Sequence, residues 1–239
     1  MEKRNLLSFT SLSEFGKSAN HLLTYWSGDK IQTSAMLEGK LTHKLILEED
    51  KVEESFVIYK DRRQGGKWEE FKEKHKDKDI VNEKEYYSCV NLSESAKKDP
   101  LFSEMLLKAT QVEKHVAWER EGVKFHGYID GIGEEESFYF DVKTCQDSGE
   151  KFQRDLRYND MPMQAAMYLD WAGDLTKPFY FVAIEKKAPF NVQVYQVGQD
   201  LIQKGYNKYT RLIKEYKEWD GSPRSYSDKI ITVNLNNNG

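Results

Sequence analysis

Residues 123–144 read VKFHGYIDGIGEEESFYFDVKT, and this stretch decides the fold. Apolar and polar residues alternate over Val123–Ile132 and again over Ser137–Thr144, which is the pattern of half-buried β-strands. Glycines and a short acidic segment separate the two runs, as the turn of a hairpin does. We therefore predict two consecutive strands, with Asp130 near the end of the first and Asp141 on the second.

A hairpin of this kind brings two aspartates to one point. Asp141 and Lys143 are two residues apart on a strand and so share a face. Two converging carboxylates repel each other unless they share a proton or bind a divalent cation, and carboxylate oxygens suit Mg²⁺ or Mn²⁺. A lysine beside such an ion can hold an attacking water or stabilise charge in the transition state. Asp130, Asp141 and Lys143 are therefore predicted to form a site for phosphodiester hydrolysis.

The pattern acidic-x-Lys is common, and only its surroundings make the copy at Asp141 informative. That copy lies on an apolar strand and follows Gly127-x-x-Asp130 at short distance. The other copies lack this setting: Glu38-x-Lys40, Glu70-x-Lys72 and Glu185-x-Lys187.

The remaining chain predicts helices on both sides of these strands. Helical periodicity is found at 9–26, 33–48, 92–110, 160–172 and 199–219. The helical stretch 92–110 is expected to break at Asp99-Pro100. Further strands are expected at 112–118, 179–184 and 192–197, the last two forming a hairpin around Ala188-Pro189. The polar stretch 49–86 is expected to be a solvated helix and loop, with a DNA-backbone contact as the alternative. This order predicts an α/β or α+β fold built on one mixed sheet.

Length and composition limit the protein to a few classes. The 239 residues predict one domain over 1–220 and a loosely ordered tail over 221–239. No apolar run is long enough for a membrane span, and the two cysteines, Cys89 and Cys145, are too few for a disulfide scaffold. A cytoplasmic protein is expected. The net charge of -4 argues against coating nucleic acid by charge alone, but not against a local basic groove.

Four motifs resemble those of the PD-(D/E)xK nucleases, in the RecB-type branch that includes RecE-type and lambda-type exonucleases. In order they are Gly39-x-x-x-His43, Gly127-x-x-Asp130, Asp141-x-Lys143 and Gln164-x-x-x-Tyr168. The resemblance covers most of residues 6–215 and implies a restriction-endonuclease-like core, with a mixed central β-sheet flanked by helices.

The resemblance also implies roles for single residues. Asp130 and Asp141 would be metal ligands, with His43 and the Val142 carbonyl assisting, and Lys143 would serve the attacking water. Gln164 would orient Lys143 or a phosphate, Tyr168 would pack against or contact the DNA backbone, and Glu113 would reach the metal through water. This chain lacks the arginine-rich run found before the motif aspartate in related sequences. The candidates for contacts to the 5′-phosphate are Arg120, Lys151, Arg154 and Arg157, the last three expected in a loop before Gln164.

Several of these residues also have a purely structural interpretation. His43 and Tyr168 could be core residues, and Glu113 competes with its neighbours Glu119 and Glu121. His126 shares the strand phase of Asp130 and could line the cleft. The remaining candidates are expected to be structural: His115, Cys145, Trp118, Trp171 and Trp219.

The function implied by the resemblance is a DNA exonuclease using Mg²⁺ or Mn²⁺, with two ions per site. It would resect linear duplex ends from 5′ to 3′ and leave 3′ single strands for a RecT-like annealing protein. A ring of three or four subunits and a phage or prophage origin are also implied. No phosphate-binding loop of an ATP-driven helicase is found, so ATP independence is expected. The alternatives are a structure-specific or restriction-like endonuclease and a non-catalytic module that binds DNA ends or the annealing protein.

Overall fold

The structure is a computed structural model that describes residues 4–28 and 33–224. Its centre is a mixed sheet in the order β1-β5-β6-β7-β8, with β4 pairing with the other edge of β5. The strands are β1 (Leu6–Leu7), β4 (Ala109–Arg120), β5 (Val123–Gly133), β6 (Tyr139–Cys145), β7 (Phe179–Glu185) and β8 (Val192–Gln196). β4–β5, β5–β6 and β7–β8 are antiparallel, and β1–β5 and β6–β7 are parallel. The predicted three-strand meander, hairpin and mixed sheet are confirmed.

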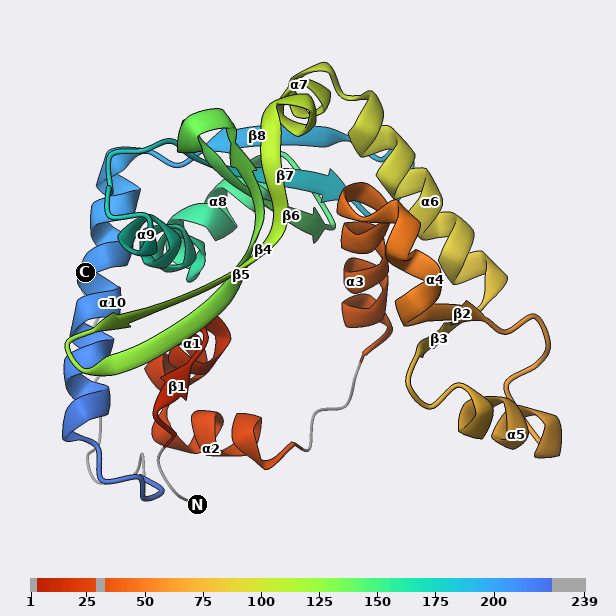
Figure 1. The fold of residues 1–239 in the computed structure, drawn as a ribbon, viewed down its shortest axis with the longest axis horizontal. Helices are drawn as coiled ribbons and strands as arrows, with labels where there is room; N and C mark the ends of the chain where they lie inside the picture. Colours follow the sequence, from red (N-terminus) through yellow and green to blue (C-terminus); the bar gives the residue numbers. More distant parts are fainter. Residues whose placement is uncertain (1–3, 29–32, 225–239) are drawn as a thin grey trace, which may run out of the picture.

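Helices cover both faces of this sheet (Figure 1). The longer ones are α1 (Phe9–Lys17), α2 (Ala19–Ser27), α3 (Ser34–Leu47), α5 (Gly66–Lys74), α6 (Glu83–Lys98), α7 (Pro100–Lys108), α8 (Glu150–Tyr158), α9 (Met161–Trp171) and α10 (Gln199–Glu218). Helices α8, α9 and α10 pack on one face, and α3, α6 and α7 pack on the other. Alternation along β6 divides its side chains between these layers, because Tyr139 faces α9 while Phe140 and Val142 face α3 and α6.

The first predicted helix, at 9–26, is in fact two helices. Ser18 is extended, with φ of −175°, and it ends α1 and begins α2. Its side chain accepts a hydrogen bond from the backbone N–H of His21, as an N-cap serine does. The apolar residues of both helices still pack in one core cluster with residues of α10. The periodicity therefore predicted the buried face correctly but not the break between the helices.

The polar stretch 49–86 contains more structure than predicted. A short 3₁₀ turn (Glu49–Lys51) and α4 (Val52–Ser55) lead to β2 (Phe56–Ile58), which pairs in parallel with β3 (Asp79–Val81). These elements and α5 lie beyond α3 and α6, away from the central sheet (Figure 1). Buried Phe56 and Val81 hold them to α3, which a solvated loop would not require.

The predicted break at Asp99-Pro100 is confirmed. Asp99 caps α7 by accepting the backbone N–H of Phe102, and Pro100 takes the first helical turn. Two further elements were missed. One is the two-residue β1, which is too short to show a period. The other is α8, whose buried residues Phe152 and Leu156 are four apart, as on one face of a helix.

The chain beyond α10 is described only as far as Arg224. Trp219 is buried, and its indole N–H donates to the Ser222 carbonyl. The backbone of Arg224 exchanges two hydrogen bonds with the Asn20 side chain. The rest of the predicted tail lies outside the described residues.

Candidate active site

The candidate site forms where β5 and β6 separate. Their pairing covers only Gly131 with Phe140 and Ile132 with Tyr139. One residue further, the Asp130 side chain enters the gap, and its Oδ2 accepts the backbone N–H of Val142 at 2.6 Å. A carboxylate thus replaces the ladder hydrogen bond at the point where the strands diverge, and it is fixed by the sheet itself.

The pairing of β1 with β5 limits the gap at its other end. β1 pairs with β5 only at Lys124 and Phe125, so in the described chain neither β1 nor β6 pairs with β5 between these two contacts. The opening is a cleft of about 350 Å³. It is lined by Ser8, Phe9, Thr10, His126, Gly127, Tyr128, Asp130, Asp141, Lys143, Gln164 and Tyr168.

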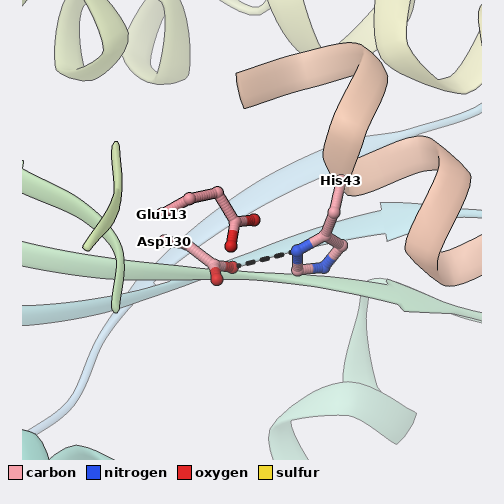
Figure 2. A group of neighbouring side chains, drawn as sticks. All are labelled: His43, Glu113 and Asp130. Atoms are coloured by element: carbon pink, nitrogen blue, oxygen red, sulfur yellow. Dashed lines mark ion pairs between the residues drawn. The ribbon is translucent and has the colours of Figure 1, made fainter. Parts of the chain in front are cut away.

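His43, Glu113 and Asp130 meet at one side of this gap (Figure 2). One ligand atom of each lies within 4.8 Å of the other two, and Nδ1 of His43 is 3.3 Å from Oδ2 of Asp130. His43 comes from α3, while Glu113 lies on β4 between Val112 and Lys114, whose partners on β5 are the two neighbours of Asp130. Glu113 has a φ of 48°, a strained conformation of the kind that often occurs at functional sites.

The environment of this group disfavours its carboxylate charges. Burial and the neighbouring Asp141 charge raise the pKa of Asp130 well above its ordinary value. Burial also raises the pKa of Glu113 and lowers the pKa of His43, which favours a neutral imidazole. Without a cation this environment therefore favours the protonated forms of Asp130 and Glu113.

Asp141 lines the same cleft as Asp130 but has different partners. Nζ of Lys143 is 2.6 Å from its Oδ2, and Nε2 of Gln164 donates to its Oδ1 at 2.6 Å. Lys143 shares its face because it is two residues further along β6, whereas Gln164 comes from the first turns of α9. Asp141 is not a member of the close group of His43, Glu113 and Asp130, and its contacts are with Lys143 and Gln164.

Tyr168 forms the floor of the cleft beside Gly127. A Cβ built on Gly127 would lie 2.8 Å from Cε1 and 3.0 Å from the hydroxyl oxygen of Tyr168. Burial and the charge of Asp141 raise the pKa of Tyr168, so its hydroxyl stays protonated. The motifs Gly127-x-x-Asp130 and Gln164-x-x-x-Tyr168 therefore fit each other, because the glycine leaves the space that the tyrosine ring occupies.

A family model matches residues 8–224 of the chain, and its description is a PDDEXK-like domain of unknown function (DUF3799). The chain belongs to this PDDEXK-like family. The predicted membership of the PD-(D/E)xK nuclease superfamily and the restriction-endonuclease-like α/β fold are confirmed. No curated protein matches the chain in sequence.

A solved structure shows the same fold as this PDDEXK-like domain. A protein of Eubacterium rectale described as a candidate exonuclease aligns over 90% of this chain and 82% of its own. The TM-score is 0.62 and the identity is 12%. The protein SSO0001 aligns over 94% of this chain and 81% of its own, with a TM-score of 0.42 and 15% identity.

The side chains of the PDDEXK-like site fit a divalent cation. His43, Glu113 and Asp130 offer one nitrogen and two carboxylate groups at mutual distances that one ion can span. Burial disfavours the negative charge of these carboxylates, and a bound cation in place of the proton would compensate that charge. The backbone of Val142, predicted to assist through its carbonyl, donates its N–H to Oδ2 of Asp130.

The predicted DNA contacts lie elsewhere on the PDDEXK-like fold. Arg120, at the far end of β4, contacts Oδ1 of Asp170 at 2.6 Å and the Tyr206 hydroxyl. It pairs with Val123, about 24 Å along β5 from Asp130 at the usual rise of a strand. The other three candidates do not lie in a loop as predicted. Lys151, Arg154 and Arg157 are exposed on α8, whose periodicity the sequence reading overlooked.

We expect Arg120→Ala to destabilise the protein without weakening its DNA binding. The change leaves the partly buried Asp170 carboxylate without its cation, and burial already raises the pKa of Asp170. A lost hydrogen bond to a charged group costs about 1.5–3 kcal/mol of unfolding free energy. Urea unfolding and DNA binding by fluorescence anisotropy would measure the two effects. A loss of affinity with unchanged stability would instead assign Arg120 to the DNA interface.

Some lining residues of the cleft were not predicted as site residues. Ser8, Phe9 and Thr10 reach the cleft because β1 leads the chain into α1 beside β5. Their sequence carries the signal of a helix start, since Ser8 caps α1 by accepting the N–H of Ser11. A helix start alone does not predict a site, and only the pairing of β1 places it there.

None of the described helices is long and apolar enough to cross a membrane.

Proposed function

We propose that this protein is a metal-dependent nuclease that hydrolyses phosphodiester bonds of DNA. One observation carries the proposal. Asp141 is held between Lys143 and Gln164, while His43, Glu113 and Asp130 gather across the same strand divergence. An acidic group that holds cations, with a lysine at the same cleft, is suited to a reaction whose transition state carries extra negative charge.

Each side chain has a role that follows from its contacts. Asp130 and His43 are positioned to bind the cation, and Glu113 completes the group from β4. A bound divalent ion supplies positive charge at the phosphate and favours ionisation of a water molecule. Lys143 supplies a fixed positive charge at the cleft and can hold the attacking water. Gln164 acts as a positioning residue, because its amide fixes the Asp141 carboxylate.

The neutral form of His43 is the one that this proposal needs. An imidazole binds a metal through an unprotonated nitrogen, and burial lowers the pKa of His43. Protons and the cation compete for the same atoms, so activity should fall as the pH decreases. Mg²⁺ and Mn²⁺ are the proposed ions, and two ions per site are the proposed number.

The finer parts of the proposal rest on the resemblance of the four motifs. In this proposal the enzyme is an ATP-independent exonuclease that resects linear duplex ends, from 5′ to 3′. The remaining 3′ single strand is passed to a RecT-like annealing protein in phage or prophage recombination. The same resemblance suggests a location in the bacterial cytoplasm. It also suggests a ring of three or four subunits, and sedimentation would test this subunit number directly.

Cleavage of linear and circular DNA tests the proposed activity. With Mg²⁺ or Mn²⁺ and no ATP, we expect linear duplex to be degraded and covalently closed circles to stay intact. Labels on each 5′ or 3′ terminus would show which end is consumed. Linearised circles would favour an endonuclease. Binding of DNA ends without cleavage under any metal would favour the non-catalytic module and overturn the proposal, and Asp141→Asn serves as the inactive control.

A further inference from the structure

A row of three rings follows the candidate metal-binding group along the β4–β5 hairpin; His115 and Tyr128 are exposed and His126 is half-buried. Glu113 and Asp130 are neighbours in this group, and the pair of His115 with Tyr128 lies two residues further along the hairpin. The pair after that places His126 opposite Ala117. Side chains on one face repeat every second residue, so each row lies about 6.8 Å from the previous one.

The rings of His115, His126 and Tyr128 form one surface, which we call the ring platform. The His115 and Tyr128 centroids are 5.0 Å apart, and the His115 and His126 centroids are 6.0 Å apart. His126 and Tyr128 line the same cleft as Asp130 and Asp141. The ring platform is therefore continuous with the candidate active site.

Packing explains only part of this arrangement. Cross-strand aromatic pairs stabilise hairpins, and the pair of His115 and Tyr128 does so. Tyr128 nevertheless leaves 54% of its surface exposed, whereas Val116 and Ile129 on the opposite face of the hairpin are almost completely buried. A half-exposed tyrosine beside a cleft offers a flat face to a ligand.

The chemistry of the neighbouring group restricts that ligand. A nucleic acid strand at the metal-binding group would place its next nucleotide within one row of Tyr128. Bases stack on aromatic side chains without regard to sequence, because every base has a π-face. In a duplex the faces of internal bases are covered by their neighbours, so away from the terminal base pair a base must be unpaired to lie against the rings.

We propose that the ring platform binds an unpaired nucleobase next to the scissile phosphate. The strand would then reach the metal-binding group as separated single-stranded DNA, even when the substrate is a duplex end. This inference rests on the proposed nuclease function and adds the state of the strand at the site.

The test measures binding in EDTA, where metal-dependent cleavage is prevented. A fluorescein-labelled oligothymidylate and a blunt hairpin duplex of equal charge are titrated with each variant at low salt. We expect Tyr128→Ala to weaken binding of the single strand about 5- to 150-fold, the range given by one stacked base. Tyr128→Phe should bind like the unmodified protein, and the hairpin affinity should change much less.

Matched variants separate stacking from folding. Tyr158, on α8, is 77% exposed and is not on the platform, so Tyr158→Ala should leave both affinities unchanged. Tyr128→Thr removes the ring but retains a residue that favours strands, and it should reproduce the loss if Tyr128→Ala unfolds.

Three outcomes would overturn the proposal that the ring platform binds a base. They are unchanged single-strand affinity in Tyr128→Ala and Tyr128→Thr, an equal loss for the hairpin, or an equal loss in Tyr158→Ala. The nuclease proposal is decided separately by cleavage with Mg²⁺ or Mn²⁺. If the enzyme cleaves DNA and the Tyr128 variants bind the single strand normally, the platform proposal is wrong and the nuclease proposal still holds.

Discussion

Replacing Lys143 with methionine is expected to lower the rate of DNA cleavage by about 10²–10³-fold, the usual cost of losing one group that stabilises transition-state charge. Nζ of Lys143 is 2.6 Å from Oδ2 of Asp141, in the cleft that also contains Asp130. Methionine retains much of the length and removes the charge. Single-turnover cleavage of labelled linear duplex at saturating metal would measure the effect.

The same variant should also change metal binding in a pH-dependent way. The positive charge of Lys143 lowers the pKa of Asp130 and opposes the increase caused by burial and Asp141. Without that charge Asp130 holds its proton more strongly, so a higher pH is needed to bind the ion. A shift of the pH–rate profile toward alkaline pH distinguishes this effect from simple unfolding.

The chain provides a matched control for Lys143. Glu185-x-Lys187 has the same pattern at the end of β7, the neighbouring parallel strand, and Lys187 is exposed. Lys187→Met should retain full activity. Comparable losses in both variants, or normal cleavage by Lys143→Met, would contradict the proposed role.

The second expected result concerns stability. A divalent ion at one hundred times its dissociation constant should stabilise the folded protein by about 2.7 kcal/mol. For a chain of this length that corresponds to an increase of about 5–10 °C in the melting temperature. Asp130→Asn should abolish the increase, because Asp130 contributes a carboxylate to the candidate cation-binding group with His43 and Glu113. Differential scanning calorimetry with Mn²⁺ or Mg²⁺ would measure it.

In EDTA the order of stability should reverse. The pKa of Asp130 is higher in the folded protein than in the unfolded chain, so the folded state binds the proton more tightly. Above the folded pKa the buried charge destabilises the protein, and stability is regained as the pH falls toward the unfolded pKa. Asp130→Asn has no such charge and can still accept the Val142 N–H through its amide oxygen. It should therefore be the more stable protein at neutral pH, with the difference shrinking on acidification.

The control for this experiment is Asp77→Asn, since Asp77 is exposed in the charged segment after α5. It should behave like the unmodified protein with and without metal. If Asp130→Asn retained the full metal-dependent increase, the ion would bind elsewhere. A lower stability of this variant in EDTA at every pH would show that the carboxylate is not destabilising.

Local patterns were sufficient for the residues that share one strand or helix. The period of two places Lys143 on the face of Asp141, and the helical spacing places Gln164 and Tyr168 one turn apart on α9. The long strands, the break at Asp99-Pro100 and the amphipathic α10 follow from the same local regularities. Their physical basis is backbone geometry, which depends on neighbouring residues in the chain.

Distant contacts decided several of the features that sequence reasoning missed or misplaced. Arg120 was expected at DNA, but α9 and α10 provide Asp170 and Tyr206 as its partners. The extended Ser18 divides the first helix, while the burial of both halves against α10 keeps their apolar pattern continuous. No spacing along the chain reports which residues of other elements will surround a side chain.

The sequence by itself determined the α/β class, the order of most elements and the identity of the charged motif residues. Only the tertiary structure decided how these residues are grouped. β5 and β6 diverge just after Gly131 and Phe140, so Asp130 turns toward His43 and Glu113 while Asp141 turns toward Lys143 and Gln164. The physical reason is that a strand pattern fixes the face of each side chain. Where two strands separate depends on the helices and strands packed against them.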